Sequence, residues 1–322
     1  MKSTPQSRAV SMLRKLILAF ALTPAVCALA DAAANASAPT IAVVTSSQVA
    51  AYEEALRGLR RELGPGQRLV VIDLDEPGAS LPKQLSQLNP TLVVAVGSAA
   101  ARATADAASS VPFLVTMVVR SQKGASLAAP GLARRGIGVV SLDLPFGAVL
   151  REIHALFPDR TRIGVLYSEA SSGLDESALQ SEAARQGFAL KAVNCKGPED
   201  VVDALVSLKR AADIVWCPPD GTLFNATTVK PLIMASLRHQ MLITGFSEGF
   251  VRAGTALGVY PDFEAIGRQT GMAVRQYLNQ GVLPGEQAAS DARVAVNERV
   301  LRLLGVHWMS PTDQQSRLSV LK

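Results

Sequence analysis

From residue 40 onward, short apolar runs alternate with longer segments whose apolar residues recur at helical spacing. The run Thr40–Thr45 is apolar and β-branched, which is typical of a parallel strand buried on both faces. The segment Tyr52–Leu63 places apolar residues at helical intervals, and Gly64, Pro65 and Gly66 then end it. Repeated alternation of this kind predicts a parallel sheet with right-handed helical crossovers.

The pattern predicts two consecutive strand–helix units. In the first unit the predicted strands are 40–45, 68–73, 91–96, 112–118 and 136–142, and the predicted helices are 52–63, 81–88 and 99–108. In the second unit the predicted strands are 162–167, 188–194, 213–217, 241–244, 255–260 and 293–296, and the predicted helices are 146–157, 174–186, 198–210, 227–239, 248–252, 262–279 and 298–304. The stretch 123–135 predicts a loop. In the helix over 262–279 we expect Ile266, Met272, Ala273 and Tyr277 on or near one face.

Two doubly wound units of similar size predict an α/β protein with two Rossmann-like lobes joined by a hinge. We expect lobe 1 to comprise residues 31–143 with about 261–290, and lobe 2 to comprise residues 144–260 with about 291–322. Ligands of open α/β sheets bind beyond the carboxyl ends of the strands. Two lobes that face each other would therefore share one ligand-binding cleft.

Residues 1–30 have the layout of a secretory signal peptide. A basic stretch precedes the apolar run Leu16–Val26, and Ala28-Leu29-Ala30 follows as a small-residue cleavage site. The apolar run is about half as long as the ~20 residues that a membrane-spanning helix needs. We expect cleavage after Ala30 and a soluble periplasmic protein. Attachment of a lipid to Cys27 is the alternative, which Val26 disfavours because lipoprotein signals have a small residue there.

Removal of this segment changes the charge of the chain. The full sequence has 32 basic and 27 acidic residues, and cleavage after Ala30 leaves 28 basic and 27 acidic ones. A nearly neutral chain with few aromatic residues excludes nucleic-acid binding through a basic or base-stacking surface. The histidines His154, His239 and His307 lie far apart and no C-x-x-C pair occurs, so we expect no metal and no cofactor. We expect a monomer.

Cys195 and Cys217 are the cysteines that remain after cleavage. They lie at the ends of the predicted strands 188–194 and 213–217. In the usual 2-1-3 strand order of such a unit, the strand 162–167 lies between these two. Strands are spaced ~4.8 Å apart, so the two cysteines would be about 10 Å apart, beyond the ~7 Å Cα limit for a disulfide. We therefore predict two free thiols.

Several segments match a known family in their order and spacing. These segments are Phe157–Tyr167, Asp213–Asp220, Gly258–Tyr260, Ile266–Gly271, and Val294–Asn297 followed by Leu304-Gly305. Over about residues 40–305 the chain resembles the substrate-binding proteins of a group of ABC-type importers, which have the type I periplasmic-binding-protein fold. The resemblance implies a protein that is not an enzyme and that delivers a small polar ligand to a membrane permease. Characterised relatives bind amino acids, aromatic ones among them, so an amino acid or a related carboxylate is the expected ligand. A membrane sensor is the alternative partner, because it would use the same closing motion.

One segment departs from the family pattern. Family members often have an Asp-Pro pair after the fourth strand, whereas this chain has Thr116-Met117-Val118-Val119-Arg120 and no carboxylate there. The ligand class of the relatives is therefore not carried over to this chain. Arg120 could bind a ligand carboxylate in place of the missing acid, or it could be a solvated loop residue.

The candidate ligand contacts lie in turns that follow strands. Turns that open helices present free backbone N–H groups, which suit a carboxylate, although their serines could equally cap the helices. Asp220, at a position that matches a family aspartate, could pair with a ligand ammonium or cap a turn. Aromatic residues at strand ends, Tyr260 among them, could line the cleft or pack in the core. The predicted ligand-binding set is Ser46, Ser47, Tyr52, Ser98, Met117, Tyr167, Ser168, Asp220, Phe246 and Ser247.

Two enzyme classes are alternatives to a binding protein. The segment 245–249 fits the G-x-S-x-G nucleophile elbow of serine hydrolases, with Ser247 as the nucleophile. However, His307 is the only histidine downstream, no HGGG segment occurs, and Gly254 interrupts the helix that would follow the elbow. A dinucleotide-binding enzyme is disfavoured because Gly136-Ile137-Gly138 lacks the third glycine of its fingerprint.

Overall fold

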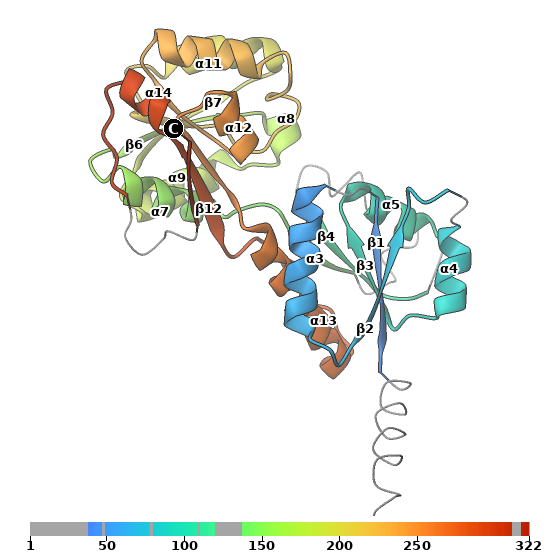
Figure 1. Ribbon diagram of the computed structural model, residues 1–322. Helices are drawn as coiled ribbons and strands as arrows, with labels where there is room; N and C mark the ends of the chain where they lie inside the picture. The colour runs from blue at the N-terminus through green and yellow to red at the C-terminus, as the bar shows by residue number, and fades with distance from the viewer. Residues whose placement is uncertain are drawn as a thin grey trace, which may run out of the picture.

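Apolar strands form two separate β-sheets in the computed structural model (Figure 1). The structure describes residues 38–46, 49–77, 80–107, 110–119, 137–310 and 317–321. Apolar side chains of helices pack on both faces of each sheet, so the chain forms two α/β lobes. The predicted fold class is confirmed.

Lobe 1 is built on a six-stranded parallel sheet with the order β11-β5-β4-β3-β1-β2. Its strands are β1 (Thr40–Thr45), β2 (Arg68–Asp73), β3 (Leu92–Val96), β4 (Phe113–Val118), β5 (Ile137–Ser141) and β11 (Glu286–Gln287). One face is covered by α3 (Ala50–Leu63) and α13 (Phe263–Gln280), and the other by α4 (Leu81–Leu88) and α5 (Ser98–Asp106). The continuously apolar strands β1, β3 and β4 are buried and form the centre of this lobe.

Lobe 2 is built on a seven-stranded sheet with the order β13-β12-β10-β9-β8-β6-β7, in which only the β10–β12 pair is antiparallel. Its strands are β6 (Arg162–Tyr167), β7 (Ala189–Asn194), β8 (Ile214–Trp216), β9 (Leu242–Gly245), β10 (Leu257–Pro261), β12 (Ala292–Asn297) and β13 (Leu318–Leu321). One face is covered by α7 (Phe146–Leu156), α9 (Glu176–Arg185) and α14 (Glu298–Leu303), and the other by α10 (Val201–Ser207), α11 (Val229–Arg238) and α12 (Glu248–Ala253).

The predicted strands and helices agree with the structure within a few residues, with four differences. Strands β11 and β13 were not predicted, because one has two residues and the other carries no buried apolar run. The helix predicted over 174–186 is α9, whereas the short helix α8 (Glu169–Ser172) before it was not predicted; α8 ends at Gly173, which has a left-handed φ of 63°. The helix predicted over 198–210 begins as a 3-10 turn and ends at Ser207. The predicted signal peptide and the predicted loop 123–135 lie outside the described residues.

Helix α13 approaches α3 closely at a glycine. A Cβ atom on Gly267 would lie 1.9 Å from the backbone oxygen of Ala55, so the two helix backbones nearly touch there. Ile266 and Ala273 are buried as predicted, but Met272 is 53 % exposed, and its predicted place on or near that face is wrong. Periodicity of large apolar residues misses a contact that depends on the absence of a side chain.

Three segments of chain connect the lobes, and they are hydrogen-bonded to one another. They follow β5, follow β10 and precede β12. The Ala289 N–H donates to the Asp143 carbonyl at 3.1 Å, and the Asp262 N–H donates to the Asp291 carbonyl at 2.9 Å. Helix α13 therefore returns to lobe 1 before β12 re-enters lobe 2 (Figure 1). We propose the hinge at these segments, with the lobe boundaries given above.

The cysteines lie as the strand order predicts. Strand β6 lies between β7 and β8, so Cys195 and Cys217 follow strands that are not neighbours. Both cysteines are free and buried, which confirms the prediction. Burial raises the pKa of the Cys195 thiol to about 11 and that of the Cys217 thiol further.

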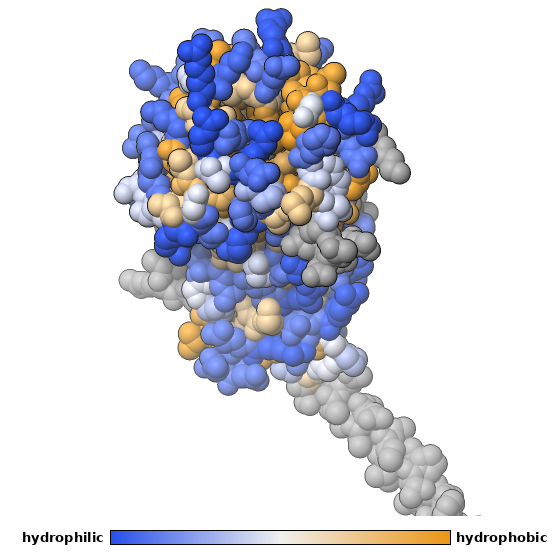
Figure 2. Space-filling model, turned by 90° about the vertical axis from the view of Figure 1, so that its left-hand side faces the viewer, coloured by the Kyte–Doolittle hydropathy of each residue, from blue (hydrophilic) through white to orange (hydrophobic). Residues whose placement is uncertain are grey.

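The surface on the lobe-2 side is mostly polar, and apolar residues occur there in separate groups (Figure 2). Large exposed apolar side chains of lobe 2 include Met234, Leu303 and Met309. Among the described residues, no helix has the length and the apolar character needed to cross a membrane.

Candidate functional site

A cavity of about 610 Å³ lies in lobe 2 beside the hinge. We call it the lobe-2 pocket. It is bordered by the segment after β5, by helices α7 and α9, and by the ends of β8, β9 and β10. Its apolar lining residues include Leu142, Leu144, Pro145, Phe146, Leu174, Leu179, Trp216, Pro218, Pro219, Phe246, Val259 and Pro261. The volume suits a small organic ligand.

Aromatic rings form one wall of the lobe-2 pocket. Phe146, the first residue of α7, stacks on Trp216, the last residue of β8, with ring centroids 4.9 Å apart and an interplanar angle of 22°. Phe246 follows β9 and packs at 5.1 Å from Phe250 of α12. Because these rings are anchored by the sheet and its helices, they give the pocket a fixed apolar surface.

Charged side chains also line the lobe-2 pocket. They are Asp143, Arg151, Asp175, Glu182 and Arg185. Asp175 caps α9 by accepting hydrogen bonds from the N–H groups of Ser177 and Ala178, at 2.8 and 3.2 Å. Glu182 forms an ion pair with Arg185. Arg151 is exposed and makes no hydrogen bond or ion pair with a described residue. Burial raises the pKa of the neighbouring Glu152, and the charges of Arg317 and Arg151 oppose this rise.

The predicted contacts of lobe 1 lie along the carboxyl edge of its sheet. Ser46 follows β1 and Ser98 opens α5 after β3. The Tyr52 hydroxyl lies over the turn between β3 and α5, since a Cβ atom on Gly97 would be 2.1 Å from it. Gly97 has a φ of 88°, which also favours glycine. The structure therefore brings Ser46, Tyr52 and Ser98 to one edge, whereas Ser47 and Arg120 lie outside the described residues.

Met117 is buried, with 3 % of its surface exposed, and packs in the cluster beneath α3 and α13. Its φ of 60° accompanies an irregularity in the pairing of β4 with β5. Met117 does not line the lobe-2 pocket. Its role as a ligand contact stays a prediction.

Tyr167 ends β6 and Ser168 follows it, and both are buried. The Tyr167 hydroxyl donates to Glu176 Oε2 at 3.0 Å, and burial together with this bond raises its pKa to about 12. The Ser168 carbonyl accepts a hydrogen bond from the Ser172 hydroxyl at 2.6 Å. Neither residue lines the lobe-2 pocket.

Asp220 follows β8 and is 4 % exposed. Its Oδ2 accepts a hydrogen bond from the Ser171 hydroxyl at 2.5 Å, and its Oδ1 accepts from the N–H groups of Thr222 and Leu223 at 2.9 and 3.3 Å. It lies outside the lining of the lobe-2 pocket. These bonds match the turn-capping interpretation of Asp220.

Phe246 and Ser247 follow β9. Phe246 is the predicted contact that lines the lobe-2 pocket. Ser247 caps α12, because its hydroxyl oxygen accepts a hydrogen bond from the Phe250 N–H at 3.1 Å. Helix α12 has six residues and ends at Gly254, as predicted. No group of three or more His, Cys, Asp or Glu side chains in the described part of the chain could hold a metal ion.

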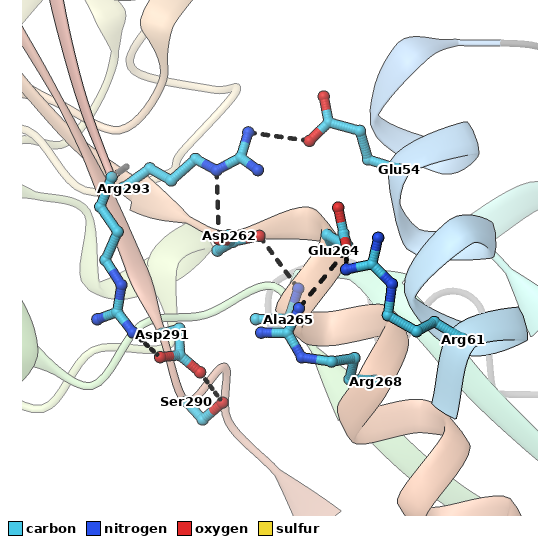
Figure 3. A network of polar contacts seen from close by, with 10 residues as sticks. Glu54, Arg61, Asp262, Glu264, Ala265, Arg268, Ser290, Asp291 and Arg293 are labelled. Carbon is cyan, nitrogen blue, oxygen red and sulfur yellow. Dashed lines mark hydrogen bonds and ion pairs between the residues drawn. The ribbon is translucent and has the colours of Figure 1, made fainter. Parts of the chain in front are cut away.

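A network of charges connects the hinge with lobe 1 (Figure 3). Arg293 of β12 lies between Glu54 of α3, at 2.9 Å, and Asp262 at the start of α13, at 3.3 Å. Beside it, Arg317 forms an ion pair with Asp291 at 2.8 Å. The network joins a helix of lobe 1 to two of the connecting segments.

Sequence reasoning missed Phe146, Arg151 and Trp216 as pocket residues. Trp216 ends a predicted strand and Phe146 opens a predicted helix, so their positions at the carboxyl edge were a usable signal. Their contact depends on how α7 lies on the sheet, which the sequence does not specify.

The fold is similar to those of several solved structures. One is CD0873 from Clostridium difficile, a substrate-binding protein with adhesive properties in a ligand-free, open form. It has 21 % identity and a TM-score of 0.63, with 88 % of this chain and 99 % of that chain covered. Another is an ABC domain from Streptococcus pneumonia in complex with L-Trp, with 18 % identity, a TM-score of 0.54, and 89 % and 100 % covered. A conserved domain protein from Vibrio cholerae has 20 % identity, a TM-score of 0.53, and 89 % and 100 % covered.

At these identities the likeness shows the fold, which is that of type I periplasmic binding proteins. No curated protein matches the chain significantly. The family model described as "ABC transporter substrate binding protein" matches residues 76–310, which is most of the chain and spans both lobes. The chain belongs to the family of ABC transporter substrate-binding proteins.

Proposed function

We propose that the protein is the solute-binding component of an ABC-type importer and binds an amino acid or a related carboxylate between its lobes. The observation that carries this proposal is the lobe-2 pocket, which lies beside the hinge at the strand ends of a two-lobed binding fold. Its border contains both hinge residues, such as Leu142, and lobe-2 residues, such as Trp216. A ligand bound there would contact lobe 2 first and lobe 1 after closure.

Ligand-driven closure follows from the division into two lobes. Among the described residues, no helix or strand of one lobe packs broadly against the other lobe. A ligand that touches both lobes therefore stabilises the closed form selectively. We propose that lobe 1 contributes Ser46, Tyr52 and Ser98, and that lobe 2 contributes Phe246 and neighbouring pocket residues.

The aromatic wall supports a ligand with an apolar part. The stacked rings of Phe146 and Trp216 suit a flat or branched apolar group better than a sugar with many hydroxyls. The similar Streptococcus pneumonia domain is in complex with L-Trp, which agrees with an apolar side chain on the ligand.

We propose that the protein works in the periplasm, after removal of residues 1–30, and that its partner is a membrane permease. A membrane sensor is the second candidate partner. Intact mass of the exported protein tests the export proposal: a chain beginning at Asp31 supports it, and a lipid on Cys27 contradicts cleavage after Ala30.

We further propose that the protein has no enzymatic activity. Ser247 caps α12, because its hydroxyl oxygen accepts a hydrogen bond from the Phe250 N–H. A screen with activated esters is expected to show no turnover. Turnover that disappears in a Ser247→Ala variant would instead support the serine hydrolase alternative.

A thermal-shift screen of amino acids, small carboxylates, peptides and nucleosides tests the binding function. A ligand at 100 times its Kd adds ~2.7 kcal/mol to the free energy of unfolding. For a protein of this size, about 2–4 °C per kcal/mol predicts a rise in Tm of several degrees. If no compound of these classes raises Tm, the proposal is wrong.

A further inference from the structure

The lining of the lobe-2 pocket follows helix α9 along its whole length. The lining residues of this helix and its two caps recur every three or four positions, a spacing that places them on one face of the helix. They are Asp175, Ala178, Leu179, Glu182, Arg185 and Gln186. Because an α-helix rises about 1.5 Å per residue, the wall that they form is about 16 Å long. The pocket is therefore elongated along α9.

Helix α7 also lines the pocket, and its direction determines where Arg151 lies. Helices α7 and α9 lie side by side on one face of the lobe-2 sheet (Figure 1). Each ends shortly before a strand of this sheet begins, α7 before β6 and α9 before β7, so the two helices run in the same direction. A Cβ atom on Gly147, in the first turn of α7, would lie 2.0 Å from Glu182 Oε1. The start of α7 therefore lies beside the carboxyl-terminal half of α9, and Arg151, one turn further on, lies at the end of the pocket opposite Asp175.

The two ends of the pocket carry opposite charges. Asp175 lies at the amino end of α9, whereas Arg151 and Arg185 lie toward its carboxyl end, where Glu182 forms an ion pair with Arg185. Asp175 accepts two backbone N–H groups through Oδ1 alone, so its exposed Oδ2 can accept from a ligand. Both arginines are exposed, and a guanidinium has five N–H donors. Ten residues separate Asp175 from Arg185, which is about 15 Å along the helix axis.

Apolar side chains line the pocket between these ends. Leu179 lies one turn after Asp175 on α9, and it belongs to the same buried cluster as Phe146 and Trp216. The stacked rings of Phe146 and Trp216 lie beside the later part of α9, because Phe146 directly precedes Gly147. Along its length the pocket therefore presents a carboxylate, an apolar middle and a cationic end.

A single α-amino acid is too short to use both ends. Its ammonium and carboxylate are attached to the same carbon, so they cannot contact groups that are about 15 Å apart along α9. In an extended peptide the two charges are separated by the whole chain, at about 3.3–3.6 Å per residue. About four residues therefore match the length of the pocket.

We propose that the lobe-2 pocket binds a short extended peptide of about four residues, with its free ammonium on Asp175 and its carboxylate on Arg151 and Arg185. Apolar side chains in the middle of the peptide contact Phe146 and Trp216. This inference rests on the proposed binding function, and it narrows the ligand to a short peptide.

Peptide length is tested by isothermal titration with L-phenylalanine, Phe-Phe and Ala-Phe-Phe-Ala. We expect the tetrapeptide to bind at least about tenfold more tightly than either shorter compound, because it alone reaches both charged ends. Binding of L-phenylalanine or Phe-Phe that equals that of the tetrapeptide would overturn the proposal, and so would no binding of the tetrapeptide.

Two modified tetrapeptides test the two ends separately. N-acetylation removes the ammonium and C-terminal amidation removes the carboxylate, and we expect each to weaken binding about fivefold or more. Asp175→Asn should abolish the effect of N-acetylation, and the double variant Arg151→Gln/Arg185→Gln should abolish the effect of amidation. Asparagine keeps an oxygen that can cap α9, so the Asp175→Asn variant should remain folded.

Matched controls come from exposed residues of lobe 2 outside the pocket. They are Asp203→Asn on α10 and the double variant Arg299→Gln/Arg302→Gln on α14, in which Arg302, like Arg185, forms an ion pair within its helix. Both controls should keep both effects. Persistence of either effect in the pocket variant meant to abolish it would overturn the assignment of the ends. If no tetrapeptide binds but another compound raises Tm in the thermal-shift screen, the binding function stands and only the ligand class is wrong. If no compound does, both are wrong.

Discussion

Asp220 illustrates, at the scale of a residue, how a candidate ligand contact can be required by the protein itself. Replacement by alanine removes the acceptor of the Ser171 hydroxyl and of two backbone N–H groups in a buried turn. Buried donors without acceptors cost about 1–3 kcal/mol. We therefore expect Asp220→Ala to lower the Tm of the unliganded protein by several degrees, measured by differential scanning calorimetry.

Asp220→Asn separates the loss of the negative charge from the loss of the acceptor of the two N–H groups. The asparagine side-chain oxygen can still accept both N–H groups, so we expect its Tm to stay within about 1–2 °C of the wild type. Asp203→Ala, an exposed aspartate on α10, controls for loss of charge. An unchanged Tm in Asp220→Ala would show that the three hydrogen bonds contribute little.

Residue roles were the least predictable part of the molecule. The positions of Asp220 and Ser247 just after strands follow from the sequence pattern, because strand ends and helix starts can be predicted locally. Whether such a side chain caps a turn or faces a ligand depends on its rotamer and on partners such as Ser171. Ser171 is 49 residues away from Asp220 in sequence, and no local pattern encodes a contact over that distance.

At the scale of elements, the contact between α3 and α13 depends on Gly267. A methyl group there would meet the Ala55 carbonyl oxygen at 1.9 Å, so the helices would have to separate. Overpacking of this kind costs about 1–3 kcal/mol, whereas glycine to alanine within a helix otherwise gains up to ~1 kcal/mol. We expect Gly267→Ala to lower the midpoint of urea unfolding.

Gly249→Ala is the matched control, since Gly249 lies in helix α12 and the nearest atom to its added Cβ is Ser247 Oγ at 3.7 Å. The midpoint of urea unfolding of Gly249→Ala should stay the same or rise. A higher midpoint in both Gly249→Ala and Gly267→Ala would mean that α3 and α13 separate at no measurable cost. The contrast also explains why helix boundaries were predicted well, whereas the buried face of α13 was predicted only in part, with Met272 misplaced. Helix ends carry local signals, whereas this face is defined by glycines whose importance appears only against α3.

At the scale of the whole molecule, the two lobes and their strand order follow from the alternating pattern, because parallel units have few allowed topologies. The interactions that join the lobes do not follow from it. Glu54, Asp262 and Arg293 come from three distant parts of the sequence and meet only after α13 returns to lobe 1 (Figure 3). Their charges alone gave no reason to pair them.

The Glu54–Arg293 ion pair joins α3 of lobe 1 to β12 of lobe 2. We expect this ion pair to stabilise the arrangement of the lobes in Figure 1 relative to a more closed one. Both side chains are partly exposed, at 23 % and 30 %, so the pair contributes at most ~1 kcal/mol. Glu54→Gln should therefore increase the closed fraction and strengthen ligand binding by up to about fivefold, measured by titration with a compound that raises Tm.

Two comparisons make this expectation specific to the hinge. Glu298→Gln removes a surface ion pair with Arg302 within α14 and should leave ligand affinity unchanged. Added salt screens partly exposed charges and so weakens the Glu54–Arg293 ion pair. With the same ligand, added salt should therefore strengthen binding to the wild type more than binding to Glu54→Gln, which lacks this pair. Small-angle scattering of the ligand-free proteins gives an independent measurement, because a larger closed fraction lowers the radius of gyration. Equal affinity and equal radius in Glu54→Gln and the wild type would show that the ion pair does not bias closure.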